Sequence, residues 1–311
     1  MEEKRVRENL LQEGTLLSQR YRIFRCVGIG GFGITYLCED IEKQRRVAVK
    51  EYFPEQWAKR EDTYVMIRKS SMIQAFRFGM QSFLDEADMM AELAGISHIV
   101  NYYDLFYDND TVYLVMEYLD GISAGRMLRE RGYRPYTPQE TAKLLLPMLE
   151  GLQQMHGKHI IHRDISPGNI MCTQDGEICL IDLGAARRYT EKKTFLGATL
   201  LKPEYAAPEQ FRTAKKGFLN EEGPWTDLYA VGAVMFYLLT GSLPPDVLSR
   251  AGGKELEKPD GLSEEWMNLI RHCMELQIED RIQEVTVLTE QMKKLLKNEM
   301  QEEKNDLHRN L

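Results

Sequence analysis

The hydrophobic pattern of the chain changes near Gly121, and this change limits the folds that the sequence can adopt. Before that point, short runs rich in β-branched and aromatic residues are separated by glycines and charged turns, which is typical of antiparallel strands. These runs are 21–27, 34–38, 46–50 and 111–118. Residues 81–93 instead carry apolar side chains at helical spacing. The first part of the chain therefore predicts a small antiparallel sheet with one main helix.

After Gly121 the pattern is mostly helical. Apolar residues recur at helical spacing in 141–156, 226–239, 263–276 and 285–297. Together the two parts predict an α+β fold of two lobes, with a ligand site in the cleft between them. We expect an N-terminal extension over 1–20, mildly helical, and a charged tail over 298–311 that frays.

Bulk composition excludes several classes of function. The formal net charge of -8 argues against general affinity for nucleic acid or for an anionic membrane surface. The five cysteines are odd in number and form no CxxC pair, so reduced thiols in a cytoplasmic compartment are expected. The longest apolar run, 230–239, is shorter than the ~20 residues that span a bilayer. No membrane insertion is predicted.

A glycine cluster, GIGGFG, occupies residues 28–33. Strand-like residues follow it, whereas a dinucleotide-binding loop would open a helix, so the loop is expected to join two antiparallel strands. Glycine at these positions lets backbone amides approach phosphate oxygens without a Cβ in the way. By itself, the cluster is equally compatible with a simple glycine-rich hairpin.

Lys50 ends the apolar run VAVK, seventeen residues after Gly33. A lysine drawn toward the interior stays charged only beside an anionic partner. Glu86, on the expected helix, shares a helical face with Met90 and is preferred as that partner over Asp85. A solvated lysine at a strand end is the alternative.

Three further motifs follow in order: IHRDISPGNIM at 161–171, IDLG at 181–184 and APE at 207–209. With the glycine loop, Lys50 and Glu86, they resemble the eukaryotic-type protein kinase family over roughly 21–297. The surroundings of Lys50 and of the HRD motif resemble the bacterial Ser/Thr kinases. Many of these kinases carry a transmembrane helix and an external sensor. Because no membrane insertion is predicted here, this chain resembles a freestanding cytosolic member.

The resemblance implies a bilobal kinase fold and a set of catalytic roles. The N-lobe would span 21–117, the hinge 117–121 and the C-lobe 122–297. Lys50 would contact the α- and β-phosphates of ATP, with Glu86 holding it. Asp182 and Asn169 would bind Mg²⁺, with Mn²⁺ as an alternative, because Mg²⁺ combines few carboxylates with phosphate oxygens and water. Asp164 would accept or orient the proton of a protein Ser or Thr hydroxyl.

The resemblance also implies the nucleotide-binding residues. The phosphates would lie under the loop residues Gly28, Ile29, Gly30, Gly31, Phe32 and Gly33. Residues sandwiching or bordering adenine would be Thr35, Ala48, Met116, Glu117, Leu119 and Met171. Plain core packing is the alternative for the apolar members of this set.

Two positions depart from the family pattern. Most Ser/Thr kinases carry Lys two residues after the catalytic-loop Asp, where this chain has Ser166. They usually carry Thr six residues before the Pro of APE, where this chain has Lys202. We predict that Lys202 reaches back to supply the missing cation, with Ser166 as its neighbour, because a lysine is a flexible point charge on a long stem. A solvated Lys202 and a simple loss at 166 are the alternative.

Other matches imply structural roles. Glu209 would pair with Arg281, Asp227 would anchor the catalytic-loop backbone, and Met90, His162 and Leu183 would form an internal column. Arg163 implies pairing with a phosphorylated activation segment, produced by autophosphorylation through a transient homodimer. The candidate acceptors are Thr190, Thr194 and Thr199. The stretch 55–78 is expected to be an inserted segment beside the helix.

The sequence therefore predicts a cytoplasmic Ser/Thr protein kinase acting on a protein substrate. A pseudokinase scaffold, which binds nucleotide without transfer, is the first alternative. A small-molecule phosphotransferase of related fold is disfavoured, because such enzymes usually lack the APE segment. Tyr specificity is disfavoured because 166–168 lacks the Ala/Arg pattern of Tyr kinases.

Overall fold

The computed structural model describes residues 9–189, 201–212 and 222–309, with side chains described as far as residue 302. The chain divides into two compact units. The first unit comprises Met1–Gly95 and Val100–Leu119, and the second comprises Ile96–Ile99 and Asp120–Leu311.

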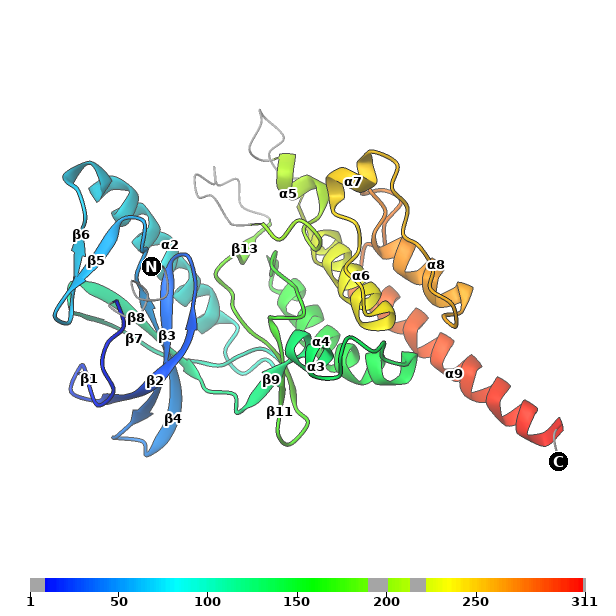
Figure 1. Cartoon of the computed structure of the whole chain (residues 1–311), viewed down its shortest axis with the longest axis horizontal. Helices are drawn as coiled ribbons and strands as arrows, with labels where there is room; N and C mark the ends of the chain where they lie inside the picture. Colours follow the sequence, from blue (N-terminus) through cyan, green and yellow to red (C-terminus); the bar gives the residue numbers. More distant parts are fainter. Residues whose placement is uncertain (1–8, 190–200, 213–221, 310–311) are drawn as a thin grey trace. The chain divides into compact units, whose positions relative to one another are not determined.

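The first unit is built on a six-stranded sheet of order β1-β2-β3-β4-β8-β7, in which all pairs are antiparallel (Figure 1). The strands are β1 Leu16–Leu17, β2 Tyr21–Ile29, β3 Gly33–Asp40, β4 Arg45–Tyr52, β7 Tyr102–Asp108 and β8 Thr111–Glu117. The four expected strands are confirmed, whereas β1 and β7 were not expected. In β7 no residue is fully buried, so its hydrophobic alternation is weak in the sequence.

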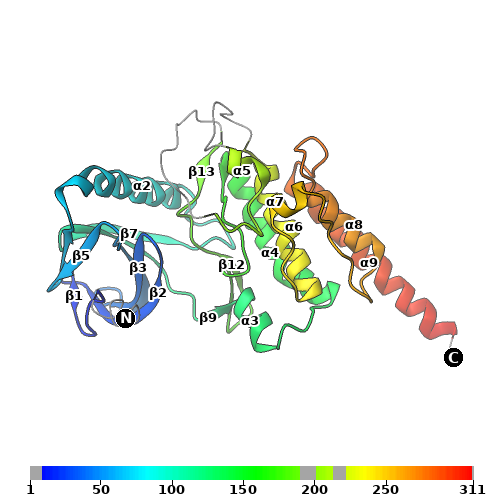
Figure 2. The ribbon, with the colours of Figure 1, turned by 45° about the horizontal axis from the view of Figure 1, so that its top comes forward.

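One long helix, α2 (Ile73–Glu92), packs against β7 and β8 of this sheet (Figure 2). It begins eight residues before the expected start at 81, after the short 3-10 helix η1 (Ser70–Met72). Gly79, which weakens a helical pattern in the sequence, is the reason for this error. A Cβ on Gly79 would lie 2.3 Å from Tyr52 Oη, so glycine is what allows the helix to approach β4.

Replacing Gly79 by Ala should therefore destabilise the protein. Alanine favours a helix by about 1 kcal/mol, but overpacking a tight contact typically costs about 1–3 kcal/mol. Here the added methyl would displace the Tyr52 hydroxyl, which donates a 2.9 Å hydrogen bond to the carbonyl of Phe76. Chemical denaturation of G79A measures the loss, and the same change on a Tyr52→Phe background should cost less. A G79A variant that is more stable than the parent would contradict this prediction.

The segment before α2 forms a β-hairpin of β5 (Ala58–Glu61) and β6 (Tyr64–Ile67). Arg60 ties it to the sheet: its Nη2 lies 2.6 Å from Glu51 Oε2, and both side chains are almost fully buried. The hydroxyls of Tyr36 and Tyr113 also donate to Glu51. Burial raises the pKa of Glu51, and these partners oppose the shift. The stretch 55–78 is thus an ordered hairpin continuing into α2.

Residues 9–20 lie on the sheet and are not helical, so the expectation of a mildly helical extension was wrong for this part. Leu11 and Leu17 are buried. The amide of Leu11 donates to Tyr36 Oη, and the carbonyl of Asn9 accepts from Arg60 Nε. These tertiary contacts, which the local sequence does not reveal, hold the segment in turns and the short strand β1 instead of a helix.

The second unit is mostly helical. Its helices are α3 Ala124–Glu130, α4 Pro138–Gly157, α5 Pro208–Arg212, α6 Pro224–Thr240, α7 Val247–Ala251, α8 Glu264–Cys273 and α9 Val285–Arg309. Its short strands are β9 Gly121–Ser123, β10 Ile160–Ile161, β11 Ile170–Thr173, β12 Ile178–Leu180 and β13 Arg187–Arg188. A capping box at Thr137 begins α4, and Gly241 at φ 70° ends α6. The predicted α+β class is confirmed.

Helix α6 forms the centre of this unit, since every residue from Thr226 to Leu239 is buried. It contacts α4 and α8, and α4 in turn contacts α9. The prediction of a buried helix over 226–239 is confirmed. No helix in the described residues is long and apolar enough to cross a bilayer.

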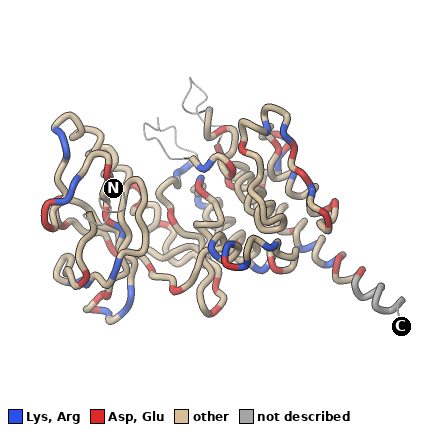
Figure 3. Tube along the Cα trace, viewed as in Figure 1, with Lys and Arg blue, Asp and Glu red and all other residues tan. Residues whose placement is uncertain are grey.

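Helix α9 continues to Arg309, so the expected helix end at 297 was wrong. The residues beyond 297 are mostly strong helix formers. Glu299 also accepts hydrogen bonds from Trp266 Nε1 at 2.8 Å and from Gln139 Nε2 at 3.1 Å, which ties the extension to α8 and α4. Both acidic and basic residues occur along its described part (Figure 3). The charged residues that suggested a fraying tail therefore belong to a helix with a solvated face.

Candidate active site

The glycine cluster forms the turn between β2 and β3, as predicted. The turn is closed by a 2.8 Å hydrogen bond from the amide of Gly30 to the carbonyl of Gly33. A Cβ on Gly33 would lie 2.6 Å from the carbonyl oxygen of Glu51, so close packing of β3 on β4 requires this glycine. Nothing in the described structure lies within 4 Å of a Cβ placed on Gly31. Its backbone is therefore open to a ligand.

The sheet register places four of the predicted nucleotide-binding residues on one face. Thr35 lies opposite Lys50 across β3 and β4, and Ala48 lies opposite Met116 across β4 and β8. Ala48 and Lys50 are two residues apart on one strand, so all four side chains share a face. Ala48 is buried, and the other three are partly exposed. Met171 lies on β11, in the second unit.

The predicted cofactor residues at the tip of the glycine loop and at the end of β8 are exposed or partly exposed to solvent. Ile29 and Phe32 are exposed, and the Phe32 ring packs against Trp57 with centroids 5.8 Å apart. Glu117 ends β8 and accepts a hydrogen bond from Asn101, and Leu119 is partly exposed after it.

Lys50 and Glu86 form a close ion pair within the first unit. Lys50 Nζ lies 2.8 Å from Glu86 Oε1 and 3.2 Å from Oε2. The Glu86 carboxylate is 6% exposed, and the Phe83 ring lies 5.7 Å from the ammonium. Asp85, the rival partner, is partly exposed and accepts a hydrogen bond from Gln81 instead. The structure therefore brings Lys50 together with Glu86, because the length and position of α2 turn residue 86 toward β4.

In the second unit, Asp227 anchors the loop that carries the HRD motif, as predicted. Its carboxylate accepts from the amides of His162 and Arg163 at 2.8 and 2.7 Å, and it lies 2.8 Å from His156 Nε2. Burial alone would raise the pKa of Asp227, but the contacts with His156 and His162 lower it below its ordinary value. A fully buried carboxylate at the start of α6 thus positions the backbone on either side of residue 162.

Acid unfolding should report on Asp227. Because its pKa is lowered in the folded state, its contribution to stability is present above about pH 4 and is lost as the pH falls below that value. Asp227→Asn should remove this part of the pH dependence. It should also cost about 3–5 kcal/mol at neutral pH, since one partner of a buried charged network is lost. Thermal unfolding between pH 3 and 7 measures both, and an unchanged profile would contradict the prediction.

Asp164 and Asn169 lie together at this loop. Asn169 Nδ2 donates to the Asp164 carbonyl at 2.8 Å and to its Oδ2 at 2.9 Å. Both amide hydrogens of Asn169 are therefore directed at Asp164, which turns Asn169 Oδ1 elsewhere. The carbonyl of Asn169 accepts from the amide of Ile181, so the backbone places Asp182 beside this pair.

Asp182 has a left-handed backbone, with φ 64°. A residue with a Cβ rarely adopts this conformation, and such strain is held only where the surrounding structure enforces it. An amide oxygen on Asn169 and a carboxylate on Asp182 are hard oxygen donors that suit Mg²⁺. The two residues therefore fit the metal-binding roles predicted for them.

Lys202 contacts both Asp164 and Ser166, the neighbour that the sequence predicted for it. Its Nζ lies 2.8 Å from Asp164 Oδ2 and 2.9 Å from Ser166 Oγ. The Lys202 side chain is 41% exposed and that of Asp164 is 22% exposed, so the cluster is open to solvent. Asp164, Ser166, Asn169 and Lys202 thus form one connected group.

The predicted Glu209–Arg281 pair is confirmed. Arg281 Nη1 lies 2.8 Å from Glu209 Oε1, and both side chains are almost completely buried. His162 and Leu183 are buried in the second unit and Met90 in the first. Thr190, Thr194 and Thr199 lie outside the described residues. At this loop, sequence reasoning missed the buried acid Glu222, which contacts Arg163.

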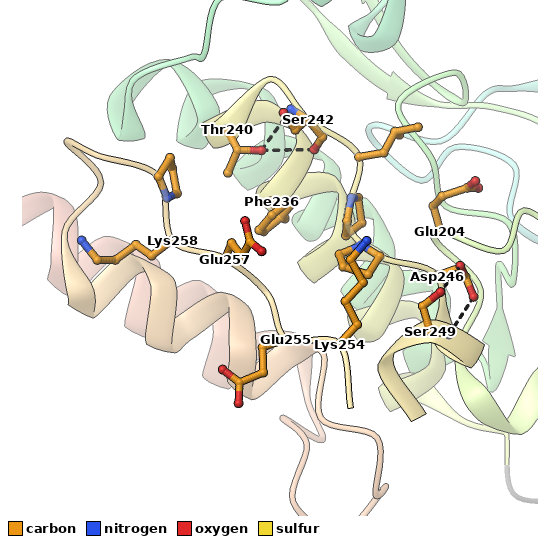
Figure 4. Close-up of a pocket in the computed structure, with 14 residues that line it drawn as sticks. Glu204, Phe236, Thr240, Ser242, Asp246, Ser249, Lys254, Glu255, Glu257 and Lys258 are labelled. Carbon is orange, nitrogen blue, oxygen red and sulfur yellow. Dashed lines mark hydrogen bonds between the residues drawn. The ribbon is translucent and has the colours of Figure 1, made fainter. Parts of the chain in front are cut away.

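A cavity of about 490 Å³ lies elsewhere in the second unit (Figure 4). Phe236, Leu243 and Pro244 line it, together with acidic and basic residues such as Glu204 and Lys258. Glu204 follows Lys202 by two residues. None of the predicted nucleotide-binding or catalytic residues lines this cavity, so it is separate from the candidate active site.

Each unit thus carries part of the equipment for phosphoryl transfer: a glycine hairpin and a lysine–glutamate pair in the first, an Asp–Asn–Lys cluster beside Asp182 in the second. The family model described as "Protein kinase domain" matches residues 21–305. The chain belongs to the protein kinase domain family.

Two curated relatives are bacterial. The chain is 32% identical over 234 residues to serine/threonine-protein kinase PrkC of Bacillus subtilis, covering 75% of this chain and 32% of that protein. It is 31% identical over 233 residues to PknL of Mycobacterium tuberculosis, covering 75% and 52%. The match therefore spans less than two thirds of these relatives' lengths. A solved structure described as "PpkA-294 apo form" matches with a TM-score of 0.77 at 28% identity, covering 91% of this chain and 99% of that one.

Proposed function

We propose that this protein is a Ser/Thr protein kinase that transfers the terminal phosphoryl group of ATP to protein hydroxyls with Mg²⁺. The contact of Lys202 with Asp164 and Ser166 is the observation that carries the proposal. It supplies a cation at a carboxylate that already has the family's partner, Asn169. The Ser/Thr kinase relatives support the acceptor class.

Asp164 is the proposed acceptor of the substrate proton. Its Oδ2 is held by Lys202 and Asn169, and the side chain keeps some exposure, so an incoming hydroxyl can reach the carboxylate. A base must come within about 2.6–3.2 Å of the oxygen that it deprotonates. Fixing the carboxylate in advance removes the cost of orienting it during the reaction.

Lys202 and Ser166 are proposed to exchange the roles that the family usually gives to the opposite residue types. The lysine reaches the catalytic carboxylate from the 202 side and donates to the short side chain at 166. A lysine carries its charge on a long stem, so the same point in space can be reached from either position. In this proposal the ammonium stabilises negative charge on the transferred group.

Asn169 and Asp182 are the proposed metal-binding residues for Mg²⁺, with Mn²⁺ as the alternative, because a few protein oxygens combined with phosphate oxygens and water suit such a cation. When bound, the metal neutralises phosphate charge and orients the phosphates for in-line transfer. Lys50, held by Glu86, is proposed to contact the phosphates. The loop 28–33 would cover them, and the face bearing Thr35, Ala48 and Met116 would contact adenine, with Glu117, Leu119 and Met171 at its borders.

The proposed partner is a protein with a Ser or Thr acceptor, and a transient homodimer is the route by which one copy would phosphorylate another. We place the protein in the cytoplasm. All five cysteines are thiols in the structure, as in proteins of reducing compartments.

The test is transfer from γ-labelled ATP to a generic protein acceptor such as casein, followed by phosphoamino-acid analysis. Label should appear on Ser or Thr with the wild-type chain and Mg²⁺, and should be absent with Asp182→Asn and with α-labelled ATP. Calorimetry of Mg·ATP binding runs in parallel. Binding without transfer would identify a pseudokinase scaffold, whereas the absence of both would contradict any nucleotide-dependent role.

A further inference from the structure

Arg163, the residue before Asp164, has a strained backbone and a buried side chain. Its backbone is left-handed, with φ 67°, and its side chain is only 4% exposed. Its amide donates to Asp227, and its carbonyl accepts from Gln210 Nε2 at 2.9 Å. A buried guanidinium needs a counter-charge close by. Because Arg163 directly precedes Asp164, the group that supplies this counter-charge also helps to hold the backbone at Asp164.

Glu222 supplies this charge. Its carboxylate accepts from Arg163 Nε at 2.6 Å and from Nη2 at 3.3 Å, a two-pronged contact that fixes the guanidinium plane. The Glu222 side chain is 1% exposed. It lies immediately before α6, the helix that also carries Asp227.

The same carboxylate contacts a second guanidinium. Arg187 Nη2 lies 2.9 Å from Glu222 Oε2. Arg187 belongs to β13, which pairs with β10, so that Arg187 lies opposite Ile161 just before the HRD motif. Glu222 therefore connects the segment after Asp182, the catalytic loop and the start of α6. Burial lowers the pKa of Arg187, and the contact with Glu222 opposes this shift.

We infer that Glu222 is a positioning residue for phosphoryl transfer: its carboxylate holds Arg163 and Arg187, and through them the catalytic loop, without a phosphate on the activation segment. The inference rests on the proposed function. It replaces the sequence-based expectation that Arg163 needs a phosphothreonine, because an internal acid already makes the contacts that such a phosphate would make.

Arg187 Nε is buried with no hydrogen-bond partner among the described residues. The arginine pair could therefore attract a phosphate in addition. The experiment must separate a site completed by Glu222 from one that depends on phosphate.

The separating variant replaces Thr190, Thr194 and Thr199 together by alanine, which removes every hydroxyl acceptor between 185 and 204 except Tyr189. Initial rates are measured on this triple variant, with intact mass confirming the phosphorylation state. The triple variant should keep kcat within about threefold of wild type, the scatter of near-neutral substitutions. A loss of tenfold or more would overturn the inference, since phosphate would then hold Arg163.

On the triple-variant background, Glu222→Gln should lower kcat by about 10- to 100-fold, the usual cost of losing a group that orients a site residue. The KM for ATP should stay nearly unchanged, because Glu222 is placed among arginines and not among nucleotide-binding residues. Glu222→Asp, which keeps the charge, should recover part of the rate. Glu177→Gln, an exposed acid in the same unit, is the matched control.

Hydrogen exchange gives a readout that does not require activity. Glu222→Gln should speed exchange at the amides of 162 and 163, which donate to Asp227, whereas Glu177→Gln should leave them unchanged. Unchanged exchange in Glu222→Gln, or an unchanged kcat, would overturn the inference. If the wild-type chain shows no transfer at all, the proposed function fails, and the exchange measurement alone decides the role of Glu222.

Discussion

Replacing Asp164 by Asn should reduce kcat by about 10²–10⁴-fold, the contribution that a positioned general base typically makes. Asparagine keeps the size of the side chain and one oxygen that can accept from Lys202 or from Asn169. It cannot accept a proton, and it removes the negative charge that holds the Lys202 ammonium. The loss should therefore fall on the chemical step and leave the KM for ATP close to its wild-type value.

Steady-state transfer of labelled phosphate to a protein acceptor measures this effect. Asp175→Asn is the matched control, because Asp175 is an exposed acid on the turn between β11 and β12. Thermal unfolding shows whether each variant is folded. Folded D164N that retained more than about a tenth of the wild-type kcat would have lost less than about tenfold in rate. That loss is smaller than the smallest contribution expected of a general base, so Asp164 would not be the proton acceptor.

Replacing Lys202 by Ala should lower kcat by about 10²–10³-fold, the usual effect of removing one preorganised charge contact to a developing negative charge. Lys202 also holds Asp164 and Ser166, so the alanine variant loses a charge and a restraint together. Lys158→Ala is the matched control, because Lys158 is an exposed lysine just after α4. A K202A enzyme with a near-wild-type kcat would show that the lysine is a solvated charge.

An exchange of residue types separates the charge from its position. The double variant Ser166→Lys with Lys202→Thr returns both positions to the family's usual residues. It should recover a large part of the rate lost in K202A, since the cation would arrive from the other side of the same carboxylate. Failure of the exchange, with K202A strongly impaired, would mean that the site is adapted to the geometry of Lys202 itself.

The elements predicted from the sequence were those with a strong local signal. The glycine hairpin, the runs at 34–38, 46–50 and 111–118, and the buried helix at 226–239 each have a clear period or an unbroken apolar run. Apart from the Lys50–Glu86 pair, which the helical face of Glu86 predicted, contacts between distant residues were predicted by resemblance. Asp227 with the loop amides and Glu209 with Arg281 were found in that way, because no local pattern reveals them.

The errors have physical causes in long-range packing. Gly79 looks like a helix-weakening residue until Tyr52 is placed beside it. The charged residues after 297 look like a fraying tail until Trp266 and Gln139 are seen to bind Glu299. The non-helical course of residues 9–20 depends on contacts with Tyr36 and Arg60. Glu222 follows a second glutamate and precedes a glycine, which is an ordinary turn composition, so nothing local marks it as a partner of arginine.

The sequence by itself determined the family, the strands and helices with a strong local pattern, and which residue types are available for phosphoryl transfer, because motif spacing and hydrophobic period are properties of the chain alone. The tertiary structure decided which charges meet. It chose Glu86 over Asp85 for Lys50, brought Lys202 to Asp164, and gave Arg163 an internal carboxylate. The reason is that a buried ion pair depends on distances of about 3 Å between side chains far apart in the sequence, and only the packing of the folded chain sets those distances.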